Sequence, residues 1–159
     1  MTLDDFAATR DVPSDDWYEA ASELKGSGHD FFDWLSAYDD SDAGVAVVAR
    51  IWSVRDRHGA MLRTRVAREG GLLPTLTTLW EGAAWHERET AEMFGIGFTG
   101  HPDPRPLLLP DGFDGHPLRK EFVLASRVAK EWPGAKEPGE SVAGRKRPPG
   151  VPPAGTWGS

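Results

Sequence analysis

The stretch VAVVARIWSVRDRHGAMLRTRVAR, residues 45–68, decides the fold. Its first part, residues 45–54, is a nearly continuous apolar run rich in valine, which makes it a strong strand candidate. Its last part, residues 61–68, alternates apolar residues with arginines imperfectly, as a half-exposed strand does. The charged, glycine-containing residues 55–60 fit a turn between them. The two runs therefore predict a β-hairpin whose arginines lie at solvated strand edges.

Upstream of the hairpin, a further strand and a helix are expected. FFDWLSAYD, residues 31–39, is rich in aromatic, β-favouring residues and runs into the turn DDSDAG. From Asp16, a candidate N-cap, apolar residues recur at helical spacing until GSGHD, residues 26–30, ends the pattern. Residues 1–16 are acidic and show no clear periodicity, so a mobile lead-in or a short helix is expected there.

Downstream of the hairpin, a second helix and a long loop are expected. Apolar residues from Leu76 to Phe94 recur at three- and four-residue steps, which predicts a helix of about five turns that ends at Gly95. The following stretch is rich in proline and glycine and predicts an irregular loop, with a short extended piece at PLLLP, residues 106–110. Residues 133–159 contain six prolines and six glycines, so they cannot build a core and are expected to lie extended on a partner.

The composition limits the classes of function. A chain of 159 residues suits one modest domain, expected over residues 17–132. The absence of cysteine excludes disulfides and thiolate-held iron–sulfur clusters. Residues 1–42 hold twelve acidic and two basic side chains, and the arginines elsewhere form no basic face for nucleic acid. The apolar runs are too short for a membrane helix and the N-terminus is acidic, so a soluble, cytoplasmic chain is expected.

One segment concentrates histidines and charges: WHERETAEMFGIGFTGHPDPRP, residues 85–106. A zinc-binding helix would need a second histidine four residues after His86, and position 90 is threonine. His101 and His116 lie beyond helix-breaking glycines, in two copies of GHP that fit turns. A stand-alone metal-dependent hydrolase is therefore kept only as the less favoured alternative.

The carboxylates of this segment are also candidates for acid–base catalysis. On a helix, however, Glu87, Arg88 and Glu89 point about 100° apart, so they cannot converge on one substrate atom. Arg88 and Glu92 are four residues apart and are expected to form an ion pair. Glu87 falls within the apolar stripe, where it must lie at the edge or be held by a buried arginine or a backbone donor. A structural ion network is favoured over catalysis.

ERETAEMFGIGFTGHPDPRPLLLPDGFDGHPLRKEF, residues 87–122, resembles the signature of the 30-kDa, or C, subunit family of respiratory NADH:quinone oxidoreductase, complex I. The resemblance extends loosely over residues 29–135. The positions that match the signature are Glu87, Arg88, Glu89, Glu92, Met93, Phe94, His101, Arg105, Leu107 and Leu108.

The resemblance implies an α+β fold, with helices on one face of a small mixed or antiparallel sheet and an extended C-terminal region. It implies a structural subunit of the peripheral arm that packs on the 49-kDa (D) type subunit of the quinone site. The flavin, iron–sulfur clusters and quinone are expected in partner subunits and no cofactor in this chain. The implied location is the cytoplasmic face of the cell membrane, reached only through the complex. An equivalent subunit of a membrane hydrogenase or of a dehydrogenase with another donor is the alternative, and a general interaction module is a third.

Within that implied role, the signature segment is expected to be an assembly surface. Arg88, Arg105 and Arg119 would make forked bonds to carboxylates or carbonyls. The apolar residues would bury area against a neighbour. His116, in the second GHP turn, belongs to the same set. The residues expected to bury apolar area are Met93, Phe94 and Leu107–Leu109.

Overall fold

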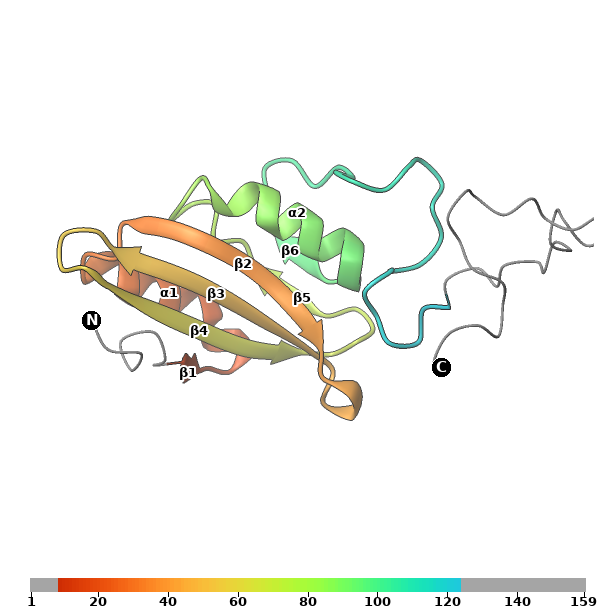
Figure 1. The fold of residues 1–159 in the computed structure, drawn as a ribbon, viewed down its shortest axis with the longest axis horizontal. Coiled ribbons are helices and arrows are strands. Elements are labelled where there is room, and N and C mark those ends of the chain that lie inside the picture. The colour runs from red at the N-terminus through yellow and green to blue at the C-terminus, as the bar shows by residue number, and fades with distance from the viewer. Residues whose placement is uncertain (1–8, 124–159) are drawn as a thin grey trace, which may run out of the picture. The chain divides into compact units, whose positions relative to one another are not determined.

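A computed structural model describes residues 9–123 of the chain (Figure 1). The elements in order are β1 (Thr9–Asp11), η2 (Ser14–Asp16), α1 (Trp17–Gly26), β2 (Phe31–Asp39), η3 (Ser41–Ala43), β3 (Val45–Ser53), β4 (His58–Val66), β5 (Leu72–Pro74), α2 (Ala83–Phe94) and β6 (Gly97–Thr99). The start of the acidic lead-in and the expected tail, residues 133–159, lie outside the described residues, as does the expected domain boundary at residue 132.

The main sheet has four strands in the order β1-β4-β3-β2. β3 pairs antiparallel with β4 from Val45 opposite Val66 to Ser53 opposite His58, which confirms the predicted hairpin. β2 pairs antiparallel with β3, and the short β1 runs parallel to β4. The sheet is therefore mixed and the fold is α+β, as expected.

Both helices contribute to one core on the same face of the sheet. Because successive strand residues point to opposite faces, Val47, Ala49 and Ile51 of β3 share one face, and all are fully buried. They belong to the same hydrophobic cluster as Trp17 of α1 and Phe94 of α2. In Figure 1 the sheet lies in front of α1. The helix-bearing face of the sheet thus holds the core.

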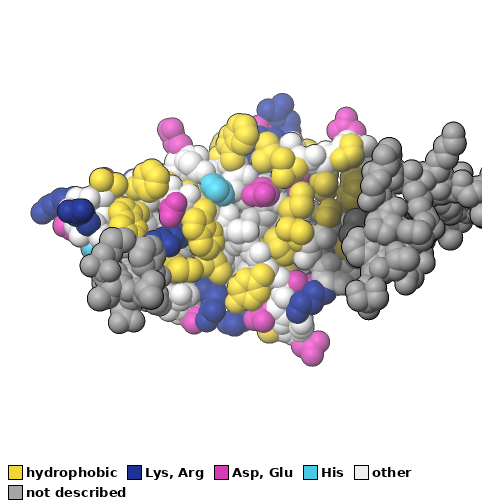
Figure 2. All heavy atoms as spheres, in the orientation of Figure 1, with side chains coloured by type: hydrophobic (Ala, Val, Ile, Leu, Met, Phe, Trp, Pro, Cys, Tyr) yellow, Lys and Arg dark blue, Asp and Glu magenta, His cyan; other side chains and the backbone are white. Residues whose placement is uncertain are grey.

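The opposite face of the sheet carries arginines, and these arginines are ion-paired. Arg63 lies 2.6 Å from Asp11, and Arg65 lies 2.8 Å from Asp40. The paired carboxylate keeps the pKa of the Arg63 guanidinium above its usual value. Figure 2 shows hydrophobic side chains interspersed with charged ones over this side of the molecule. Arg63 and Arg65 are thus partly solvated, as predicted, and they also have ion-pair partners that the sequence did not indicate.

Three local predictions differ from the structure. Thr9–Asp11 form a strand rather than a mobile lead-in or a helix, because β4 offers a free edge with which they pair. The second helix begins at Ala83 rather than near Leu76, although Leu76 is buried as the apolar stripe required. The expected extended piece at residues 106–110 is a series of bends instead.

The late start of α2 has a local cause. Thr75 accepts the N–H of Thr77 through its hydroxyl oxygen at 3.1 Å, which favours a turn over a helix. The N–H of Leu76 is bonded to a side-chain carboxylate of α2, and the turn continues to Gly82, the N-cap of α2. The chain ahead of α2 also forms β5, which pairs in parallel with β6 beyond α2.

Among the described residues, no helix has the length and apolar content that crossing a membrane requires.

Candidate assembly site

The signature segment begins on α2 and continues into a loop that we call the anchored loop, residues 100–122. Gly95 ends α2 in the left-handed conformation, with φ of 70°, and its N–H bonds to the carbonyl of Ala91. A Cβ atom at this position would collide with the imidazole of His116 and the guanidinium of Arg119. The anchored loop therefore packs directly on the C-terminal end of α2.

Glu92 holds the middle of the anchored loop. Its carboxylate accepts the backbone N–H groups of Leu107 at 2.7 Å, Leu108 at 2.8 Å and Leu109 at 3.3 Å. Consecutive N–H groups that converge in this way form an anion-binding nest. Burial pushes the pKa of Glu92 upward, but the three N–H groups outweigh it and the net pKa is lowered. The bends at PLLLP exist because the backbone wraps this carboxylate.

Arg88 holds the first part of the anchored loop. Its Nε and Nη2 donate to the carbonyl oxygens of Arg105 and Pro106, both at 2.8 Å, and its guanidinium lies 3.5 Å from Asp103. Arg105 in turn makes a forked pair with Asp103, which lowers the pKa of Asp103 to about 2. The predicted Arg88–Glu92 ion pair was wrong, because each side chain binds the loop instead of the other.

His116 and Arg119 bind the carbonyl groups at the end of α2. His116 Nδ1 donates to the carbonyl of Glu92 at 2.7 Å, and Arg119 Nε donates to that of Phe94 at 2.7 Å. The last carbonyls of a helix have no partner within the helix, so these bonds satisfy groups that need one. Arg119 also donates to the carbonyl of Arg68 at 2.6 Å. The guanidinium of Arg119 thus joins the end of α2 to the segment that follows β4.

Glu87 is fully buried beneath α2. Its carboxylate accepts the hydroxyl of Thr75 at 2.5 Å and the N–H of Leu76 at 2.6 Å. The sequence predicted that Glu87 lies at the edge of the stripe or is held by a buried arginine or a backbone donor. The N–H of Leu76 is such a backbone donor. Burial raises the pKa of Glu87, and the hydrogen bonds from Thr75 and Leu76 oppose this rise only in part.

His101 lies beside Glu87, with Nε2 at 3.9 Å from the carboxylate. Its Nδ1 accepts the N–H of Asp103 at 3.0 Å, and its Nε2 lies 3.0 Å from the carbonyl of Ala84. A nitrogen that accepts a hydrogen bond carries no proton, so this geometry requires the neutral Nε2–H tautomer. His101 therefore ties the start of the anchored loop to the first turn of α2.

The remaining signature residues divide between core and surface. Phe94 is buried in the core, and Met93 packs against it while half-buried. Leu107 is half-buried, whereas Leu108 is 60% exposed. Glu89 and Arg105 are exposed, and Glu89 has no hydrogen bond or ion pair with another described residue. Within residues 9–123, no three histidine or acidic side chains come together in a way that would hold a metal ion.

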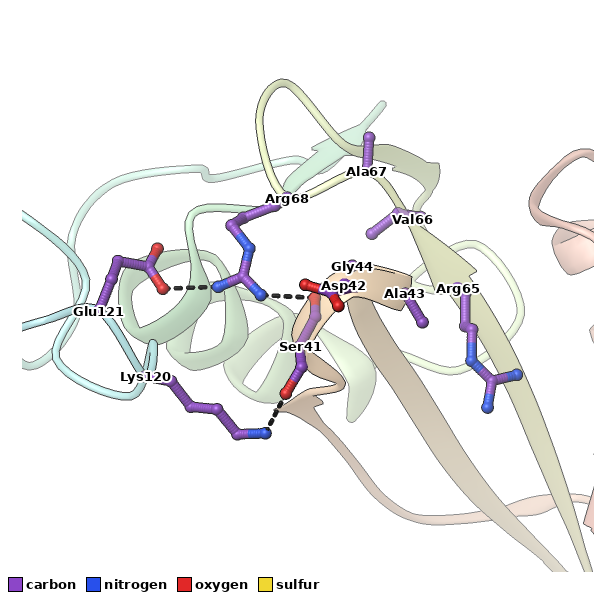
Figure 3. A pocket seen from close by; sticks show the side chains of 10 residues that line it. All are labelled: Ser41, Asp42, Ala43, Gly44, Arg65, Val66, Ala67, Arg68, Lys120 and Glu121. Carbon is purple, nitrogen blue, oxygen red and sulfur yellow. Dashed lines mark hydrogen bonds and ion pairs between the residues drawn. The ribbon is translucent and has the colours of Figure 1, made fainter.

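Sequence reasoning missed the group that holds the end of the anchored loop. Asp39 lies at the end of β2. Its carboxylate accepts hydrogen bonds from Nη1 and Nη2 of Arg68, both at 2.6 Å, and from the backbone N–H of Lys120 at 2.8 Å. These bonds hold the pKa of Asp39 well below its usual range. Figure 3 shows Arg68 lying between Ser41 and Glu121, to both of which it is bonded. These residues line a cavity of about 860 Å³. The only sequence signal was a β-favouring stretch, residues 31–39, that ends on an aspartate.

The cations around this cavity are all engaged. Arg68 bonds Asp39, Glu121 and the carbonyl of Ser41, and Lys120 Nζ lies 2.5 Å from the hydroxyl of Ser41. Arg68 and Lys120 are therefore both bonded to other described residues, and these bonds close the end of the anchored loop on the sheet.

The fold and the site together define an α+β domain in which side chains of one helix hold a long irregular loop by its backbone. The family described as respiratory-chain NADH dehydrogenase, 30 Kd subunit, matches residues 10–128. The chain belongs to this family.

Individual relatives agree with this assignment. The C-type subunit of NADH-quinone oxidoreductase from Coxiella burnetii is 41% identical over 92 residues, which are 58% of this chain and 40% of the relative. A solved trypsin-resistant fragment of Nqo5 is 31% identical with a TM-score of 0.56, and the match covers 60% of this chain and 80% of that one. A chain of an archaeal respiratory membrane complex, the membrane-bound sulfane sulfur reductase, is 26% identical with a TM-score of 0.67. The match covers 74% of this chain and 72% of that one. The chain spans less than half the length of the curated relatives it matches.

Proposed function

We propose that the chain is a structural subunit of the peripheral arm of NADH:quinone oxidoreductase. The observation that carries this proposal is the anchored loop, which keeps a defined backbone while Leu108 is 60% exposed. A loop that is already ordered loses little conformational entropy when a partner binds. The loop is therefore suited to docking. The side chains that hold it form their hydrogen bonds within the chain and not with a substrate.

The neighbour in this proposal is the 49-kDa (D) type subunit that forms the quinone site. The chain would support electron transfer from NADH to quinone, coupled to proton translocation elsewhere in the complex, by packing on this neighbour. Flavin, iron–sulfur clusters and quinone would reside in partner subunits. The sequence has no cysteine with which to ligate a cluster. The chain would lie at the cytoplasmic face of the cell membrane and be held there by its partners.

The test is an affinity purification of the tagged chain from detergent-extracted membranes of its own host. We expect the chain to co-purify with flavin- and iron–sulfur-containing subunits and with NADH:quinone oxidoreductase activity. The chain purified alone should be colourless and redox-silent. A full-length chain that never enters such a complex, or that turns over a substrate alone with a bound metal, would overturn the proposal.

A second candidate is the equivalent subunit of a respiratory membrane complex that uses another electron donor. The likeness to a chain of the sulfane sulfur reductase complex, which reaches a TM-score of 0.67, supports this candidate. The same purification separates the two, because the partner subunits and the donor that reduces the isolated complex would differ. Reduction of the complex by NADH selects the first candidate.

A further inference from the structure

The outer side of α2 exposes a large aromatic side chain. Trp85 is 68% exposed, although most tryptophans of folded domains bury most of their surface. It lies three residues before Arg88 and seven before Glu92, so these three residues share one face of the helix. Because Arg88 and Glu92 are fixed to the anchored loop, Trp85 stands on a rigid support. Because the backbone that carries the indole is already fixed, it loses little conformational entropy when a partner binds.

Two carboxylates lie near this indole along the chain. Glu89 follows Trp85 by four residues on α2, and Glu81 precedes it by four in the turn that leads into the helix, where the carbonyl of Glu81 accepts the N–H of Ala84 at 3.2 Å. Side chains four residues apart on a helix are neighbours, which places Glu89 beside Trp85, whereas Glu81 lies ahead of the helix, one residue before its N-cap Gly82. Both residues are exposed, and neither carboxylate has a hydrogen bond or ion pair with another residue of the described part. We call Glu81, Trp85 and Glu89 the acidic tryptophan face.

The charges near this face do not neutralise it. Arg88 bonds to carbonyl groups and lies close to Asp103, and the Arg105 guanidinium is paired with the same Asp103. Lys25, which lines the same surface hollow as Glu81, lies over the Trp80 ring and has no ion pair with Glu81, so the carboxylates of Glu81 and Glu89 stay unpaired within the described residues. The open face of the sheet is different, because its arginines Arg63 and Arg65 already have carboxylate partners. The acidic tryptophan face thus combines an exposed indole with unpaired carboxylates.

We propose that the acidic tryptophan face docks an arginine-bearing segment of a partner subunit. A guanidinium stacks on an indole by a cation–π interaction and at the same time offers forked donors to a carboxylate. Arginine meets both requirements better than lysine, whose ammonium group is a compact and strongly hydrated charge. This inference rests on the proposed function for the existence of a partner subunit, and it adds the surface and the chemistry of the contact.

The test uses the full-length chain in its native complex. Trp85→Ala and Glu89→Arg are each expressed as the sole copy, and the fraction of the chain in the membrane-extracted complex is measured on native gels. We expect a loss of incorporation on the order of tenfold for each variant, as for a tryptophan at the centre of an interface. Both residues are exposed, so the melting temperature of each purified variant should match that of the unchanged chain.

Matched controls lie on other surfaces. Phe31→Ala removes an aromatic side chain that is 53% exposed on β2, and Glu19→Arg reverses an exposed glutamate on α1. Both controls should retain full incorporation. A photoreactive residue at position 85 should crosslink to a partner peptide that contains arginine.

The outcomes separate this inference from the proposed function. Normal incorporation of both variants, or a crosslink to a second copy of this chain or to a segment without arginine, would refute the inference while the complex still forms. Absence of the unchanged chain from the complex would refute the proposed function itself, and the inference with it.

Discussion

Polar residues of one helix, within six positions, meet three different environments. Glu87 points into the core, Arg88 and Glu92 bind the anchored loop, and Glu89 faces outward. The spacing of a helix explains the division, since each residue is rotated about 100° from the one before. The role of a charged residue in α2 therefore depends on the side of the helix on which it lies and not on its chemical type.

Glu92 and Glu89 provide a matched pair on the same helix. Glu92→Ala should lower the free energy of unfolding by about 1.5–3 kcal/mol, because three N–H groups of the anchored loop lose a charged acceptor. Glu89→Ala should change it by less than about 0.5 kcal/mol, as exposed substitutions usually do. Urea denaturation of the two variants measures both values. Equal effects would show that the nest around Glu92 contributes nothing to stability.

Glu87 makes a prediction about pH. Because burial raises its pKa in the folded state, its contribution to stability is fully present below the unfolded value of 4.5 and is lost as pH rises through the folded pKa. Glu87→Gln removes this loss. We therefore expect the melting temperature of the variant, relative to the unchanged chain, to rise between pH 4 and pH 7. A difference that stays constant or falls over this range contradicts the assignment.

At the scale of elements, the hairpin and α1 were predictable because their signals are local. The valine-rich run of β3 and the alternating pattern of β4 lie side by side in the sequence, and the structure pairs them as expected. The start of α2 was not predictable from its apolar stripe, because Leu76 is buried in a turn as fully as it would be in a helix. The parallel pairing of β1 depends on β4, about fifty residues away, and leaves no periodic signal.

The candidate site was predictable as a set of residues but not as a geometry. Arg88, Glu92, His116 and Arg119 were singled out, and the structure brings all four together at α2 and the anchored loop. Their partners are backbone N–H and carbonyl groups. Because nearly every residue has these groups, the sequence does not show which residue is the partner. For the same reason, Asp39 passed as the last residue of a strand although its carboxylate holds the end of the loop.

Gly95 tests the junction between α2 and the anchored loop. Gly95→Ala should lower the free energy of unfolding by about 1–3 kcal/mol, because the residue has φ of 70° and the added methyl group would meet His116 and Arg119. Gly26→Ala is the control, since it ends α1 and its added methyl group meets no atom within 4 Å. Thermal melts of the two variants decide the matter. If Gly95→Ala melts like its control, the loop does not pack on the end of α2.

At the scale of the whole molecule, the region beyond the described residues carries a separate prediction. Residues 133–159 hold six prolines and six glycines, together with the basic cluster Arg145–Arg147 and Trp157. Deleting them should leave the melting temperature of the chain nearly unchanged, because such a composition cannot form a core. Incorporation into the membrane complex should fall. A much lower melting temperature would mean that the segment belongs to the domain core, and unchanged incorporation would mean that it has no role in docking.

The way in which Arg88 and Glu92 hold the anchored loop also affects how the loop can change during evolution. Both side chains bind carbonyl and N–H groups, which nearly every amino acid provides. At positions 107–109 only proline, which lacks an N–H, would break the nest. The exposed side chains of this loop are therefore free to diverge, while two residues of α2 preserve the path of the chain.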